Sequence, residues 1–113
     1  MGISEWSDAI VLADLEDEPA LSDDLRAMAR RLEQKKSGCG HVVLNMSAVN
    51  YLNSSNLAQL LRLRKLCMEH RRRLCLCSVS TQVWGILLVT GLDKVFDFKD
   101  DVMVALASVQ LEQ

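Results

Sequence analysis

Four consecutive polar residues, Asn53-Ser54-Ser55-Asn56, are the part of this sequence best suited to chemistry. They come directly before Leu57, where apolar residues begin to recur at helical spacing. Side chains of these types cap helices, because their oxygens accept hydrogen bonds from the unpaired amides of the first turn. A phosphate on Ser54, or as second choice on Ser55, would carry about −1.5 to −2 charges, which a helix start tolerates. The turn is a candidate phosphorylation switch, and a simple helix cap is the plainer interpretation.

The cysteines offer a second chemistry, and they number four: Cys39, Cys67, Cys75 and Cys77. Cys75 and Cys77 point to one face of a predicted strand, but no second Cys-x-x-Cys pair or suitably spaced histidine pair completes a zinc site. A disulfide framework would need an oxidising compartment, which no secretion signal indicates. We therefore expect the cysteines to fill the core as small hydrophobic residues, with no metal and no cofactor.

Nothing in the sequence favours catalysis. His41 and His70 fall at a predicted strand start and a predicted helix end, without an acid or nucleophile at a telling spacing. Gly38 and Gly40 lack the lysine and the following Ser or Thr of a nucleotide-binding loop. The sequence thus predicts a binding module and not an enzyme.

Length and composition predict one folded domain over residues 1–113, with residues 1–7 flexible. Half of the residues are hydrophobic and a quarter are charged, which is typical of a globular protein. The chain has no N-terminal secretion signal, and no apolar run approaches the roughly 20 residues of a membrane span. We expect a cytoplasmic protein that does not insert into a membrane.

Charge is unevenly distributed along the chain. Residues 1–24 carry eight acidic side chains and no Lys or Arg, whereas a basic block follows later: Arg62, Arg64, Lys65 and Arg71–Arg73. The block could bind nucleic acid or anionic lipid, but aromatic residues that would stack on bases are scarce. A solvated helix end is the favoured interpretation, and we predict no nucleic-acid partner.

Apolar spacing predicts an alternation of strands and helices. Strands are expected over residues 9–13, 42–46, 74–79 and 95–98. Helices are expected from Pro19 to a stop at residues 37–40, over 55–70 and 80–90, and from Asp100 or Asp101 onward. In the third helix, Ser80 is the expected N-cap, Gly91 a left-handed end, and Trp84 is either core or part of an exposed docking surface. This order predicts an α/β fold with a mostly parallel sheet of about four strands and about four helices.

The segment from Val43 to Leu57 also carries a family resemblance. Val43-Leu44-Asn45-Met46, Val49, Tyr51-Leu52-Asn53-Ser54-Ser55 and Leu57 resemble the signature of the STAS domain of bacterial anti-sigma factor antagonists. That signature is a hydrophobic strand, an aromatic-apolar pair, then Asp-Ser-Ser/Thr-Gly-Leu opening a helix. Ser80, Val83, Leu87 and Gly91-Leu92 continue the likeness downstream. Two positions depart from it, because Asn53 replaces the acidic residue and Asn56 replaces the glycine.

The resemblance implies a single STAS-like domain with a mixed sheet, whose N-terminal strand region looks shortened here. It implies docking through Asn53, Ser54, Ser55, Asn56 and Leu57, with Trp84 nearby, onto an anti-sigma factor that is an ATP-binding serine kinase. Phosphorylation of Ser54 would block docking and a serine phosphatase would restore it, as in partner-switching regulation of transcription. The two asparagines leave an alternative open, a constitutive STAS scaffold subunit of, for example, a membrane lipid transporter. A third hypothesis is a small-ligand sensor with an apolar pocket.

Overall fold

The computed structural model describes residues 2–7, 9–34 and 40–111. Its strands are β1 (Ile3–Ser7), β2 (Ile10–Glu16), β3 (His41–Ala48), β4 (Leu74–Cys77) and β5 (Asp97–Lys99). Its helices are α1 (Ala20–Gln34), α2 (Ser54–Glu69), α3 (Thr81–Thr90) and α4 (Val102–Leu111), with a short 3-10 helix, η1, at Leu92–Lys94. The α/β fold with four α-helices is confirmed.

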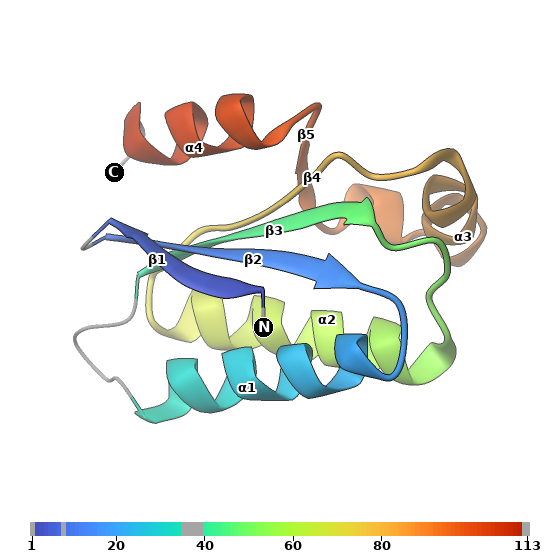
Figure 1. The fold of residues 1–113 in the computed structure, drawn as a ribbon, viewed down its shortest axis with the longest axis horizontal. Coiled ribbons are helices and arrows are strands. Elements are labelled where there is room, and N and C mark those ends of the chain that lie inside the picture. The colour runs from blue at the N-terminus through green and yellow to red at the C-terminus, as the bar shows by residue number, and fades with distance from the viewer. Residues whose placement is uncertain (1, 8, 35–39, 112–113) are drawn as a thin grey trace.

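The strands form one mixed sheet in the order β1-β2-β3-β4-β5. β1 is antiparallel to β2, and the other neighbouring strands are parallel. Helices α1 and α2 cover one face, α4 covers the other, and α3 lies beside the carboxyl ends of the strands (Figure 1). The loops after β2, β3 and β4 therefore meet at one edge of the sheet, which is the edge where open α/β sheets bind their ligands.

Strand β3 is apolar on both faces because both faces are covered. Val42, Leu44 and Met46 pack into the core shared with α1 and α2, whereas Val43 packs under α4. All four side chains are fully buried. Burying a side chain of this size contributes about 1.5–3 kcal/mol relative to leaving it exposed, so β3 anchors the turn that follows it.

Helix α1 shows the amphipathic pattern that the sequence predicts. Leu21, Leu25, Met28 and Leu32 form its buried stripe, and each is at most 2% exposed. Pro19 was predicted as the first helical residue but precedes the helix by one position. The predicted helix stop at residues 37–40 lies, except for Gly40, outside the described residues.

The N-terminal region differs from the prediction. Residues 1–7 were expected to be flexible and the first strand region shortened, but Ile3–Ser7 forms β1 and brings the sheet to five strands. Ile3 packs against the core and Glu5 forms an ion pair with Arg31 of α1. Because β1 is an edge strand with mostly exposed polar positions, its sequence lacks the apolar alternation that would have indicated it.

Two other strands have different bounds from those predicted. β2 continues through Asp14 to Glu16, past the predicted end at Ala13, because β3 pairs with it along this stretch. Its acidic side chains occupy exposed positions, so backbone pairing extends the strand without burying charge. β5 is Asp97–Lys99 and not residues 95–98, and Phe96 instead contributes its buried ring to the core before the strand begins.

Candidate functional site

The turn between β3 and α2 is built around two asparagines. Asn53 is the N-cap of α2, with extended backbone angles, and its side-chain oxygen accepts from the Asn56 N–H at 2.8 Å. In return, Asn56 Oδ1 accepts from the Asn53 N–H at 3.0 Å. This reciprocal pair is a capping box formed by asparagines. The cap is therefore Asn53, and Ser54 and Ser55 are the first two helical residues.

Both serines are exposed to solvent, as a docking and modification site requires. Neither hydroxyl forms a hydrogen bond with another side chain or backbone group in the described part of the chain. Tyr51, which precedes the turn, is 64% exposed and adds a large ring to the same loop. The helix start thus offers two open hydroxyls, with unpaired first-turn amides behind them.

Asn56 has a different role from the predicted one. It was predicted to contact a partner, but its side chain is 0% exposed. Its Nδ2 donates to Glu18 Oε2 at 3.2 Å and to Gln59 Oε1 at 3.3 Å. A residue whose amide is fully engaged inside the protein cannot face a partner, so Asn56 fixes the turn from behind. Leu57 is also partly buried against the core, which leaves little of it to contact a partner.

Glu18 links the start of α2 to the start of α1. Its carboxylate accepts from the Ser22 N–H at 2.7 Å and from the Ser22 hydroxyl, besides its bonds with Asn56 and Asn53. These hydrogen bonds, those from Ser22 first, lower the pKa of Glu18 below its usual value. A carboxylate therefore lies at the start of α2 although residue 53 is not acidic.

Asp17 links the same two loops a few residues away. Its carboxylate accepts from the Asn50 N–H at 2.8 Å and from Asn50 Nδ2 at 2.9 Å. The bonds from Asn50 lower the pKa of Asp17. The sequence alone did not assign Asp17, Glu18 or Tyr51 to the site. The signal that could have found them is their position after β2, because the ends of parallel strands meet at one edge.

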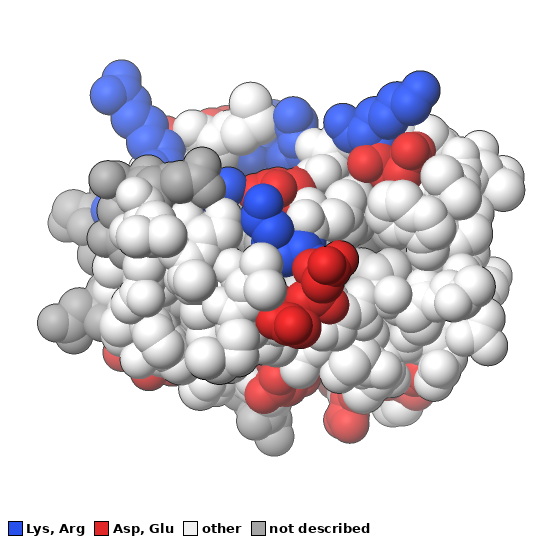
Figure 2. All heavy atoms as spheres, turned by 90° about the horizontal axis from the view of Figure 1, so that it is seen from above, with Lys and Arg blue, Asp and Glu red and all other residues white. Residues whose placement is uncertain are grey.

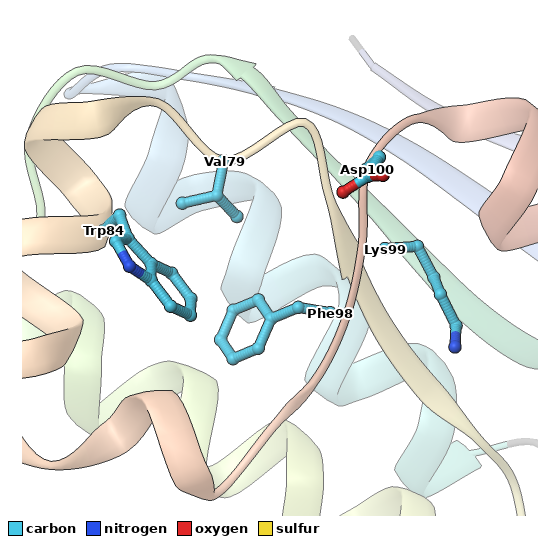
Figure 3. Close-up of a pocket in the computed structure, with 5 residues that line it drawn as sticks. All are labelled: Val79, Trp84, Phe98, Lys99 and Asp100. Carbon is cyan, nitrogen blue, oxygen red and sulfur yellow. The ribbon is translucent and has the colours of Figure 1, made fainter.

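Trp84 belongs to a neighbouring feature and not to the turn itself. Helix α3 begins beside the β3–α2 loop, where the Ser80 hydroxyl caps α3 and donates to the Val49 carbonyl at 3.3 Å. The predicted cap at Ser80 and the left-handed end at Gly91, with φ of 77°, are confirmed. Trp84 is partly buried and lines a pocket of about 260 Å³ with Val79, Phe98, Lys99 and Asp100 (Figure 3).

The cysteines in the described part of the chain are buried, as predicted. Cys75 and Cys77 share the face of β4 that packs under α4, and Cys67 lies in the core on the other side. Burial raises the pKa of Cys75 to about 12 and that of Cys77 to about 11. These two thiols stay protonated near neutral pH and are poor nucleophiles. Cys39 lies outside the described residues.

Several side chains of the basic block bind acceptors within the protein and so do not form one free basic patch. Arg62 forms an ion pair with Glu33 at 2.9 Å, Arg64 donates to the Val95 carbonyl at 3.0 Å, and Arg73 pairs with Asp97. On the face of the molecule that carries α4, basic side chains lie in the upper half of the view with acidic ones among them, the lower half shows only acidic charge, and much of the surface is neutral (Figure 2). The visible charge pattern on that face does not favour a polyanion.

Within residues 2–7, 9–34 and 40–111, no three His, Cys, Asp or Glu side chains lie close enough to hold a metal ion. None of the helices in these segments is both long and apolar enough to span a membrane.

Comparisons with known proteins agree with this architecture. A family model described as the STAS domain matches residues 17–105. An anti-sigma F factor antagonist of Paenibacillus polymyxa is 27% identical over 90 residues, which cover 80% of this chain and 76% of that protein.

Three solved structures share the fold at lower sequence identity. An anti-sigma-factor antagonist (STAS) domain protein from Planctomyces limnophilus has a TM-score of 0.79 and 18% identity over 96% of both chains. A sulfate transporter family protein from Wolinella succinogenes has a TM-score of 0.77 and 18% identity, over 90% of this chain and 85% of that one. The Bacillus cell fate determinant SpoIIAA, in its phosphorylated form, has a TM-score of 0.72 and 14% identity, over 94% and 95%.

Proposed function

The chain belongs to the STAS domain family, and we propose that it is a non-enzymatic protein-binding module that acts as an anti-sigma factor antagonist. The proposal rests on one observation: Ser54 and Ser55 stand exposed at the positive end of α2, on a turn that is held rigid from within. The docking surface consists of Tyr51, Ser54 and Ser55, with the exposed parts of Asn53 and Leu57 at its margin. We keep Trp84 as a second, separate candidate contact.

Rigidity favours this surface for docking. The capping box and the bond from Asn56 to Glu18 fix the first turn of α2 before a partner arrives. A pre-ordered surface loses little conformational entropy on binding, so more of the interaction energy appears as affinity. Tyr51 adds an exposed aromatic side chain, which is among the residue types that dominate binding energy at interfaces.

The partner that we propose is an anti-sigma factor with an ATP-binding serine kinase fold, and Ser54 is the residue it phosphorylates. A phosphate there would be stabilised by the α2 amides in the free protein. In a closely packed interface the same dianion would have to be desolvated and would repel acidic groups of the partner. Phosphorylation therefore releases the partner without unfolding the domain, and a serine phosphatase restores docking.

Phosphorylation is tested by incubating the protein with ATP and the cognate anti-sigma factor, followed by mass spectrometry of the peptides. We expect one phosphate on Ser54 in the wild type and in Ser55→Ala, and none in Ser54→Ala. Ser55→Ala is the matched control, because it removes the neighbouring exposed hydroxyl from the same turn. A phosphate that persists in Ser54→Ala, or its absence from the wild type, would show that Ser54 is not the acceptor.

Docking is tested separately by calorimetric titration with the same anti-sigma factor. We expect Ser54→Glu and Tyr51→Ala each to raise Kd at least about tenfold, which corresponds to about 1.4 kcal/mol. Met103→Ala, which truncates a 75% exposed side chain on α4, should leave Kd within about twofold. Equal affinities for all three variants would place the docking surface elsewhere.

A constitutive scaffold is the second candidate function. Two observations favour it: asparagines replace the family's acidic residue and glycine, and Asn56 uses its position to lock the turn. The fold is also shared with the sulfate transporter family protein from Wolinella succinogenes. Copurification distinguishes the two functions. Recovery of a membrane transporter subunit, with Ser54 unmodified, would support the scaffold, and recovery of an ATP-binding anti-sigma factor would support the switch.

A further inference from the structure

A second recess lies at the same edge of the sheet as the docking turn, between α3 and the connection from β5 to α4. It encloses about 260 Å³ and is lined by Val79, Trp84, Phe98, Lys99 and Asp100. Val79 and Trp84 come from the segments that follow β4, Phe98 and Lys99 from the end of β5, and Asp100 from the residue after it. The recess therefore lies at the carboxyl ends of parallel strands (Figure 3). Ligands of open α/β sheets bind at such positions.

Two aromatic rings form its walls. The rings of Trp84 and Phe98 are nearly perpendicular, at 88°, with centroids 5.1 Å apart. Both side chains are only partly buried, and Val79 lies beside them (Figure 3). The face of an aromatic ring is electronegative and attracts a cation placed within about 6 Å of its centre, most strongly for Trp. In this edge-to-face pair the edge of one ring meets the face of the other, and both rings line the recess.

The charged residues of the recess are arranged asymmetrically. The Lys99 side chain extends away from the two rings (Figure 3), and its ammonium lies 3.7 Å from an oxygen of Asp97. Asp100 is exposed and forms no hydrogen bond or ion pair with any residue that the structure describes. Asp101 is also acidic, but its carboxylate accepts from the Val104 N–H and caps α4. The mouth of the recess thus carries a carboxylate that its only lysine does not neutralise.

We propose that this recess binds a guanidinium or alkylammonium group, with the cation against the Trp84 and Phe98 rings and paired with Asp100. An apolar stem would lie along Val79. Aromatic faces and one carboxylate are the combination that recognises organic cations, because the rings replace part of the hydration that the cation loses. The site is distinct from the serine turn and does not depend on the proposed docking function.

Tryptophan fluorescence provides a direct readout. The chain has two tryptophans, so Trp6→Phe leaves Trp84 as the sole source of tryptophan fluorescence. The probes are acetyl-arginine amide and tetramethylammonium, each compared with a neutral analogue of similar shape, acetyl-citrulline amide or neopentyl alcohol. We expect saturable changes with Kd in the millimolar range for the cations, and at least about fivefold weaker binding of the neutral analogues.

Three variants, made in the Trp6→Phe background, assign the binding to this recess. Asp100→Asn and Phe98→Leu should each raise Kd for the better cation at least about threefold. Glu69→Gln is the matched control, because it removes one exposed carboxylate at the far end of α2 and should leave Kd unchanged. If Phe98→Leu does not fold, or if Trp6→Phe does not, the indole N–H resonance of Trp84 in wild-type and Asp100→Asn protein gives the same information by NMR.

The outcomes are decisive for the site and independent of the docking proposal. Stronger binding of acetyl-arginine amide would identify a protein side chain as the natural occupant, and stronger binding of tetramethylammonium would identify a small free cation. Equal binding of charged and neutral probes, no saturation below about 50 mM, or no effect of Asp100→Asn would overturn the proposal. None of these results would change the phosphorylation of Ser54 or the affinity for an anti-sigma factor.

Discussion

Replacing Asn56 with alanine should destabilise the domain far more than replacing its exposed neighbour Ser55. Asn56 is fully buried and connects the start of α2 to the segment before α1. Alanine would leave the Asn53 N–H without its side-chain acceptor and would remove the donor that contacts Glu18 and Gln59. The change tests whether Asn56, which occupies the position of the family's glycine, stabilises the fold through its side-chain hydrogen bonds.

The expected magnitude follows from the bonds that are lost. Each hydrogen bond contributes about 1 kcal/mol net as a lower bound, since the bond to the Glu18 carboxylate is charge-assisted. The Asn56 side chain has three partners in addition to a longer contact with Ser22 at 3.5 Å. Alanine regains about 0.5 kcal/mol because it favours a helix more than asparagine does. We therefore expect a loss of about 2.5 kcal/mol, which lowers Tm by roughly 10 °C in a domain of this size. Asn56→Gly should lose about 1 kcal/mol more.

Urea unfolding followed by circular dichroism measures this difference. Ser55→Ala, in the same first turn but exposed, should stay within about 0.5 kcal/mol of the wild type. The dependence of the unfolding free energy on urea should have the same slope in all variants, since the folded state keeps its compactness. If Asn56→Ala proves as stable as Ser55→Ala, the hydrogen bonds of Asn56 do not hold the turn, and our account of the rigid docking surface is wrong.

Two further predictions concern buried titratable groups. His41 Nδ1 accepts from the backbone N–H of Arg73 at 2.9 Å, and burial, with Arg72 and Arg73 close by, lowers the pKa of His41 below the usual 6.5. Because the folded state favours neutral His41, the free energy of unfolding should be highest above pH 6.5 and fall as the pH decreases toward 5. His41→Gln should flatten this pH dependence in urea titrations. Burial raises the pKa of Cys75 to about 12 and that of Cys77 to about 11. Iodoacetamide at pH about 8 should therefore leave both thiols unlabelled in the native protein and label both in about 8 M urea, as measured by peptide mass spectrometry. Rapid labelling of either thiol in the native state would contradict their burial.

The sequence predicted the features that depend on neighbouring residues. The stripe of α1, the apolar run of β3, the cap at Ser80 and the left-handed end at Gly91 all reflect spacings of a few residues. It also located the exposed serine turn and the family resemblance, since these lie in one continuous segment. β1 escaped prediction because an exposed edge strand needs no apolar alternation.

Only the tertiary structure decided which polar side chains face the interior and which face solvent. Asn56 and Glu18 are 38 positions apart in the chain, and they meet because parallel strands bring the ends of β2 and β3 to one edge of the sheet. The same packing placed Trp84 and Phe98 around one recess and directed the Lys99 side chain away from their rings. Local spacing specifies a helix and its cap, whereas contacts between distant segments depend on how the helices and strands pack. The hydrogen bonds of the buried Asn56 side chain and the cation-binding recess could therefore be found only in the folded chain.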